Sequence, residues 1–186
     1  MLASSQAATA KPLTFDLKRS AKATAANCLA DAEGHVTVTP QRGAELMKIT
    51  VKGLPPNTEF DVFVTQLPNA PFGMSWYQGD IQTNAAGIGH ATFRGRFNIE
   101  TNIVAPGSGA APVVHTDPPF PDASTNPATN PIHTYHIGVW FNSENDAAAA
   151  RCPADVTPFN GVHHAGIQAL STNQFGDTDG PLRQLE

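Results

Sequence analysis

The chain has 186 residues, of which 40% are hydrophobic and only 15% are charged, and its formal net charge is −5. The charged fraction lies below the roughly 25% of an average soluble domain, and uncharged polar residues replace the missing charges, as is common in extracellular β proteins. No run of Lys and Arg is present, so we expect no nucleic-acid binding. No apolar stretch approaches the roughly 18 residues that a membrane-spanning helix needs, so we expect no membrane span.

The length suits one domain. Residues 1–11 are small and polar, and we expect a flexible N-terminal segment ahead of a single domain over residues 12–186. The first residues lack the basic region and the long apolar region of a signal peptide. From the composition and the two cysteines we nevertheless expect a secreted or cell-surface protein, with the signal peptide removed.

Short segments in which hydrophobic and polar residues alternate predict half-buried β-strands. In the first half of the chain the hydrophobic positions of these strands are Leu13, Phe15 and Leu17, then Val36 and Val38, then Met47, Ile49 and Val51, and then Phe60, Val62 and Val64. Further strands are predicted over residues 76–83, 90–100, 132–141 and 165–171. About seven or eight short strands with turn signals between them favour an all-β fold, an antiparallel β-sandwich.

One short helix and one long loop interrupt this pattern. Ser143 is placed to cap a helix, with Asp146 three residues later, alanines over residues 147–150 and Pro153 as the stop. Residues 104–131 contain seven prolines, which cannot join the interior of a sheet. A loop of this length is uncommon and is often functional.

The two cysteines, Cys28 and Cys152, form no metal-binding spacing. We expect them to form a disulfide, and two buried free thiols are the alternative. A disulfide implies an oxidising compartment.

The stretch GLPPNTEF, residues 53–60, resembles the Leu-x-Pro-x-Thr-x-Tyr corner of fibronectin type III and related immunoglobulin-like sandwiches. The resemblance implies a turn between sheets that Leu54 and an aromatic ring pin in place. Phe60 stands where that family has Tyr, so the hydroxyl hydrogen bond of the corner is missing. The corner also comes earlier in this chain, so the strand order of the family is not carried over.

Residues 45–97 more closely resemble uncharacterised secreted bacterial sandwich domains, through GLPPNTEFDVFV and WYQGDIQTNAAGIGHATFRGRF. They also resemble the chordin-like repeat, which is itself similar to copper-zinc superoxide dismutase. The His-x-His of a dismutase strand is replaced by Asp61-Val62-Phe63 after Phe60. The resemblance therefore implies a β-sandwich fold without dismutase activity.

Histidines and acidic residues offer weak metal candidates. The pairs His133 with His136 and His163 with His164 each point to opposite faces of an extended chain, so neither forms a local clamp. A site made across strands from His136 and one of His163 or His164 stays open beside structural histidines. Asp177-Thr178-Asp179-Gly180 resembles a fragment of a calcium loop, or is a polar turn. We expect no cofactor.

Catalytic signatures are missing from the sequence: it contains no Gly-x-Ser-x-Gly elbow, phosphate loop or dinucleotide fingerprint. We therefore expect no catalytic residues. Trp76 and Tyr77 follow Phe72 and Pro71, and Trp140 lies in a later strand. Exposed Trp76, Tyr77 and Trp140 would form a platform for a glycan, although such rings also fill cores and interfaces.

The leading hypothesis is a non-enzymatic extracellular β-sandwich that acts by contact, as a structural or assembly subunit or a surface-interaction module. Its partner would be a second copy or another surface protein, and residues 1–11 would add a strand to a neighbour's sheet edge. The second hypothesis is a glycan-binding module. The third is a metal-dependent enzyme with cross-strand histidines.

Overall fold

The computed structural model describes four stretches of the chain, residues 11–73, 75–100, 132–157 and 164–185. The proline-rich loop 104–131, His163 and all of the predicted N-terminal segment except Lys11 lie outside the described residues.

Eight strands form one antiparallel sheet, which confirms the prediction of a mostly β fold. They are β1 (Leu13–Arg19), β2 (Glu33–Gln41), β3 (Ala44–Lys52), β4 (Glu59–Thr65), β5 (Ser75–Gln82), β6 (Gly89–Gly95), β9 (His136–Phe141) and β10 (Gln168–Ser171). Their order across the sheet is β5-β4-β9-β10-β1-β2-β3-β6. A separate pair joins β7 (Ile99–Glu100) to β8 (Ile132–His133).

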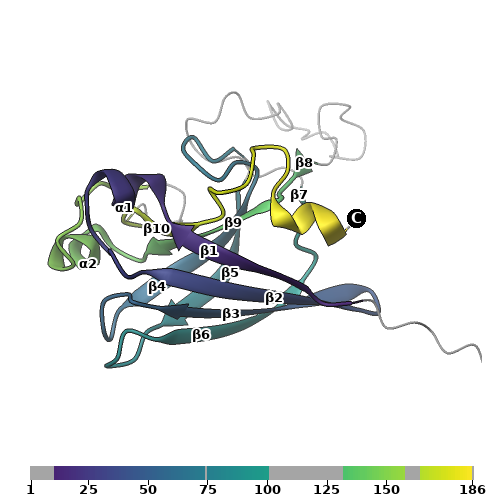
Figure 1. The fold of residues 1–186 in the computed structure, drawn as a ribbon, viewed down its shortest axis with the longest axis horizontal. Coiled ribbons are helices and arrows are strands. Elements are labelled where there is room, and N and C mark those ends of the chain that lie inside the picture. The colour runs from purple at the N-terminus through teal and green to yellow at the C-terminus, as the bar shows by residue number, and fades with distance from the viewer. Residues whose placement is uncertain (1–10, 74, 101–131, 158–163, 186) are drawn as a thin grey trace, which may run out of the picture.

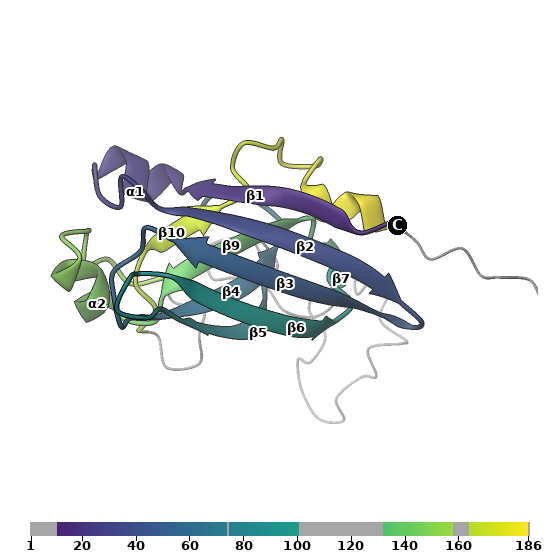
Figure 2. The same ribbon diagram turned by 60° about the horizontal axis from the view of Figure 1, so that its bottom comes forward.

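The sheet curls nearly into a barrel because β1 belongs to both of its halves. Residues 13–17 of β1 pair with β2, whereas residues 18–19 pair with β10. The half β1-β2-β3-β6 therefore crosses in front of the half β5-β4-β9-β10 (Figures 1 and 2). The end strands β5 and β6 are joined by a hairpin and meet at the bridge Thr83–Gly89. The predicted sandwich has two separate sheets, and this sheet is continuous.

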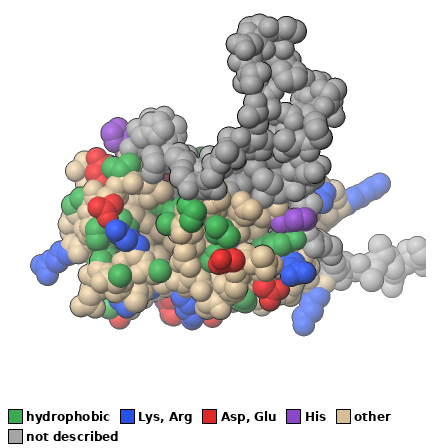
Figure 3. All heavy atoms as spheres, turned by 90° about the horizontal axis from the view of Figure 1, so that it is seen from above, with side chains coloured by type: hydrophobic (Ala, Val, Ile, Leu, Met, Phe, Trp, Pro, Cys, Tyr) green, Lys and Arg blue, Asp and Glu red, His purple; other side chains and the backbone are tan. Residues whose placement is uncertain are grey.

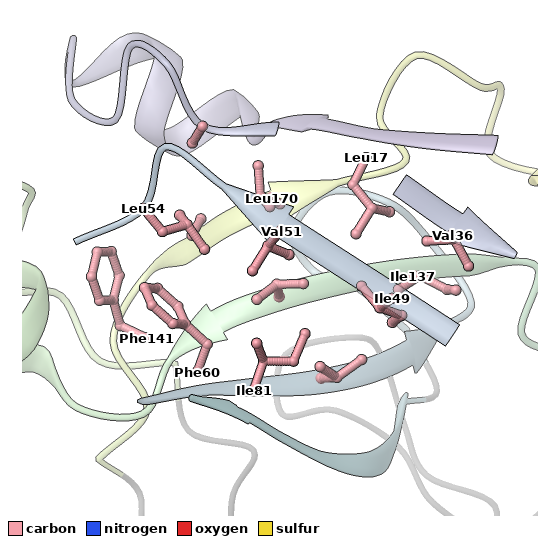
Figure 4. Close-up of a cluster of buried hydrophobic side chains, with 14 of the residues drawn as sticks. Leu17, Val36, Ile49, Val51, Leu54, Phe60, Ile81, Ile137, Phe141 and Leu170 are labelled. Carbon is pink, nitrogen blue, oxygen red and sulfur yellow. The ribbon is translucent and has the colours of Figure 1, made fainter. Parts of the chain in front are cut away.

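The hydrophobic core lies between the two halves (Figure 4). Leu17, Val36, Ile49 and Val51 come from one half, and Phe60, Ile81, Ile137, Phe141 and Leu170 come from the other. Each of these side chains is at most 1% exposed, and burying one stabilises the fold by about 1.5–3 kcal/mol. The alternation read from the sequence marks Leu17, Val36, Ile49, Val51 and Phe60 correctly as inward positions.

The outer faces of the two halves differ. In β3 the buried positions Met47, Ile49 and Val51 alternate with exposed Lys48, Thr50 and Lys52, so this outer face contacts water. In β9 and β10 every residue is buried, and in β4 only the first residue is exposed. Strands that are covered on both faces have near-continuous apolar runs, as in HIGVWF of β9.

The helices agree only in part with the prediction of a single short helix. Helix α2 (Glu144–Ala149) is confirmed, and the Asp146 backbone N–H donates to the Ser143 hydroxyl oxygen at 3.1 Å. Helix α1 (Ala21–Ala25) and the 3₁₀ helix η2 (Pro181–Leu185) were not predicted. Each has five residues, too few to display a helical period of hydrophobic positions. None of the described helices is long and apolar enough to span a membrane.

Three predicted strands are shorter in the structure, and one of them, 165–171, begins only at Gln168 as β10. The predicted strand 90–100 ends as β6 at Gly95, and the predicted strand 132–141 is divided into β8 and β9. At the division, the Thr134 backbone N–H donates to the Asn98 carbonyl at 3.0 Å, and the Thr134 hydroxyl donates to the Phe97 carbonyl at 3.2 Å. These bonds draw the chain out of the eight-stranded sheet.

The predicted disulfide is confirmed: Cys28 and Cys152 are joined, with their Cα atoms 5.5 Å apart. Cys28 follows α1 and Cys152 follows α2, and both helices lie at the same end of the sheet (Figure 1). The bond therefore ties the early part of the chain to a segment 124 residues later.

Replacing both cysteines, Cys28→Ser with Cys152→Ser, should lower the free energy of unfolding by about 5 kcal/mol, because the unfolded chain regains the entropy of an open loop. Urea unfolding followed by circular dichroism measures this change. Added reductant should destabilise the natural chain and leave the double variant unaffected. A loss below about 1 kcal/mol would contradict the clamping role of the disulfide.

Candidate functional site

A row of aromatic rings crosses the outer face of β5, β4 and β9. Tyr77 contacts Phe63 at a centroid distance of 5.5 Å, Phe63 contacts Trp140 at 5.4 Å, and Phe72 contacts Trp140 at 5.1 Å. The contacts of Trp140 are edge-on, the arrangement that the charge distribution of aromatic rings favours. The row therefore begins at the edge of the sheet and ends on the β4–β5 connection.

Gly138 lets this row lie against the sheet. A Cβ atom at this position would be 2.4 Å from Cζ3 of Trp140 and 2.5 Å from Nε2 of Gln168. The indole of Trp140 and the amide of Gln168 therefore both lie over the backbone of Gly138. A larger residue at 138 would displace one of them.

The structure does not assemble the predicted platform of Trp76, Tyr77 and Trp140. Trp140 is fully buried, so its ring cannot stack on a sugar, and the expectation is corrected at this residue. Tyr77 lies opposite Phe63 and points outward, whereas Trp76 lies opposite the core residue Val64 and points to the other face. Trp76 and Tyr77 are nevertheless 40% and 48% exposed, because β5 is an end strand.

Tyr77, at the start of the row, lies close to several carboxylate groups. Its hydroxyl donates to a carboxylate oxygen of Asp80. Burial raises the pKa of Tyr77 well above its usual value, and the carboxylates of Asp80, Asp61 and Glu59 raise it further. The phenol is therefore a neutral hydrogen-bond donor at physiological pH.

A pocket of about 540 Å³ lies at the other end of the row, beyond Phe72. Its walls are residues 21–22 of α1, residues 69–72 of the β4–β5 connection, residues 155–157, and residues 167–168 at the start of β10. Most of the lining is apolar. The exceptions include Asn69, Gln168 and the ion pair of Lys22 with Asp155, whose atoms are 2.6 Å apart.

Ser20 attaches the α1 wall to β10. Its backbone N–H donates to the Ala169 carbonyl at 2.9 Å, and its hydroxyl donates to the Gln168 carbonyl at 2.5 Å. The same hydroxyl oxygen accepts the Ala23 backbone N–H and so caps α1. The disulfide at Cys152 then brings residues 155–157 to the opposite wall.

The predicted metal site from His136 with His163 or His164 finds no support in the described residues. His136 is fully buried, with Nδ1 2.9 Å from the Thr172 hydroxyl and Nε2 3.0 Å from the Asp177 carbonyl. A carbonyl only accepts, so Nε2 carries the proton and Nδ1 accepts from Thr172. Both nitrogens are thus engaged. The exposed His164 lies 3.8 Å from Glu144 of α2.

The stretch Asp177-Thr178-Asp179-Gly180 forms a hydrogen-bonded turn. The Asp179 backbone N–H donates to the Gly176 carbonyl at 2.9 Å, and the Asp179 carboxylate lies 3.3 Å from Arg183. In the part of the chain that the structure describes, no group of three His, Cys, Asp or Glu residues is placed to hold a metal ion.

The chain matches no protein-family model and no curated protein sequence. The resemblances to immunoglobulin-like and chordin-like sandwiches therefore stay predictions. On the side seen from above in Figure 3, acidic and basic side chains are interspersed among hydrophobic ones.

Sequence reasoning missed the pocket, although one signal was present. Pro71 and Phe72 stand out in the sequence beside Gly73 and the later Trp76, and they form part of one wall. Gln168 gives no such signal, because it is one polar residue in an otherwise predictable strand.

The free energy of unfolding should fall as the pH drops below about 6.5, the ordinary histidine value. Burial lowers the pKa of His136 in the folded chain. As the pH falls, the histidine of the unfolded chain is therefore protonated first, which favours unfolding. The free energy of unfolding should fall by up to about 1.4 kcal/mol per pH unit. Urea unfolding at several pH values measures the slope. The variant His136→Gln should flatten it and the surface control His90→Gln should keep it. An unchanged slope in His136→Gln would contradict the assignment of this pH dependence to His136.

Proposed function

We propose that this protein is a non-enzymatic, extracellular surface-interaction domain, and that it assembles with a second copy of itself through strand β5. The observation that carries the proposal is the exposure of Trp76 and Tyr77, which lie in succession on this end strand and point to its two faces. Adjacent exposed aromatic side chains of this size are typical of protein contact surfaces. The disulfide supports an oxidising, extracellular compartment.

The edge of β5 adds backbone groups to this surface. β5 is an end strand of the sheet, and it meets the other end strand, β6, at the bridge Thr83–Gly89 and where the ring of Phe93 lies against Gly79. Residues 75–78 lie away from these contacts, and the Gln78 side-chain amide donates to the Trp76 carbonyl at 3.1 Å. Free backbone groups at the edge of a sheet pair readily with another chain. An exposed edge with two aromatic rings thus supports association by strand pairing combined with apolar burial.

A second copy fits this surface better than a highly charged partner. The chain carries few charges, and Trp76, Tyr77, Gln78 and Gly79 form an uncharged run. Closed twofold assembly uses the same surface on both copies, so this run would face itself without opposing like charges. Asp80 limits the pairing, because a register that opposed it to its own copy would be repulsive.

Sedimentation velocity of the natural chain should show a dimer, and the double variant Trp76→Ser with Tyr77→Ser should sediment as a monomer. Val156→Ser, which removes the other exposed large hydrophobic side chain among the described residues, is the matched control and should remain dimeric. A natural chain that is monomeric at every concentration tested would contradict self-assembly. If this monomer showed quenched Trp76 fluorescence with a polysaccharide, the glycan-binding hypothesis would take its place.

A further inference from the structure

Three exposed basic side chains without an ion pair lie together on β3, β6 and the β2–β3 turn. They are Lys48 on β3, Arg94 on β6 and Arg42 in the turn, and we call them the basic patch. Lys48 lies opposite Thr92, and Arg94 lies two residues further along β6. Such diagonal neighbours have Cα atoms about 7–8 Å apart. The turn and the end of β6 lie at the same end of the molecule (Figure 2).

No free carboxylate among the described residues of this outer face neutralises the basic patch. Asp16 lies 3.7 Å from Lys18, and Glu33 lies 2.6 Å from Lys52, toward the opposite end of the strands. Glu45 alternates with the outward residues of β3 and is only 8% exposed. The whole chain has a net charge of −5, so a face with uncompensated positive charge is a local exception. A field of this sign attracts a negatively charged partner.

The neighbours of the basic patch indicate which kind of anion fits it. Thr37 and Thr92 flank Lys48 in the register of the strands, and Thr39 lies opposite Leu46. Their hydroxyls can donate to and accept from sugar hydroxyls. The described outward positions of β2, β3 and β6 include no Phe, Tyr or Trp, so they offer no ring for stacking nucleic-acid bases. Leu46 is their one large apolar residue, so a protein or a lipid bilayer would gain little apolar burial.

We propose that the basic patch binds an acidic polysaccharide, a chain of sugars that carry carboxylate groups. Its carboxylates contact Arg42, Lys48 and Arg94, and its hydroxyls contact the threonines between them. Arginine matches a carboxylate with two parallel hydrogen bonds. Because the cations are exposed, each contact is weak and sensitive to salt. The patch shares no residue with the β5 surface, so either proposal can fail alone.

Two probes with the same sugar backbone test the role of charge. Fluorescently labelled oligogalacturonate should bind the full-length chain saturably at low ionic strength, as measured by fluorescence anisotropy. Its fully methyl-esterified form has no carboxylate and should not bind measurably. Three ionic contacts predict that the affinity falls about 20-fold between about 50 and 200 mM NaCl. Absence of saturable binding at low salt, or equal binding of the ester, would overturn the proposal.

A third probe separates a polysaccharide from a nucleic acid. Single-stranded oligothymidylate with the same number of charges should bind less tightly than oligogalacturonate, because no ring on this face can stack on its bases. Equal or tighter binding of oligothymidylate would overturn the assignment to a polysaccharide.

Substitutions then assign the binding to the basic patch. Lys48→Gln with Arg94→Gln should lower the affinity for oligogalacturonate about tenfold at low salt, the effect of two exposed ionic contacts, and should weaken the salt dependence. The control Lys22→Gln with Arg151→Gln removes the same charge near α1 and α2, at the other end of the sheet (Figure 1), and should keep the affinity. Arg42→Gln with Lys48→Gln repeats the test if the first variant does not fold. Full affinity in the patch variant, or an equal loss in the control, would overturn the proposal.

Discussion

The packing of Trp140 over Gly138 is the contact on which the outer side of the molecule depends. Because position 138 has no side chain, the indole lies directly on the sheet beside the Gln168 amide. Phe63 and Phe72 then pack edge-on against the ring. Aromatic rings thus cover part of the outer face of β4, β9 and β10, where buried polar residues such as Asp61 and Gln168 also lie, while the outer face of β3 stays in water. The proposed contact surface lies at one end of the aromatic row and the pocket at the other.

The walls of the pocket are held by contacts that also join the halves of the sheet. β1 pairs with β2 and then with β10, and Ser20, the next residue, continues the bonding to β10 before it caps α1. The disulfide then connects the turn after α1 to the segment after α2. The pocket is thus built on bonded elements, which favours a preformed site over one that must order on binding.

Local sequence patterns predicted most strands, one helix and the disulfide. The order of the strands in the sheet and the burial of its outer face depend on long-range contacts. Alternation identified the strands, Ser143 identified α2, and two cysteines allowed one intramolecular pairing. The sharing of β1 between halves depends on pairing with a strand at the far end of the chain. Trp140 was a candidate for either an exposed platform or the core, because alternation cannot show whether an outer face is covered. The apolar run HIGVWF was the available sign that β9 is buried on both faces.

Acrylamide quenching of the two tryptophans, one at a time, tests the covered face most directly. In Trp76→Phe the remaining Trp140 should emit at short wavelength and resist quenching, because its ring is fully buried. In Trp140→Phe the remaining Trp76, which is 40% exposed, should emit at longer wavelength and be quenched readily. A Trp140 that is quenched as readily as Trp76 in a folded chain would mean that this face is open, and would contradict the arrangement of the aromatic row and the pocket.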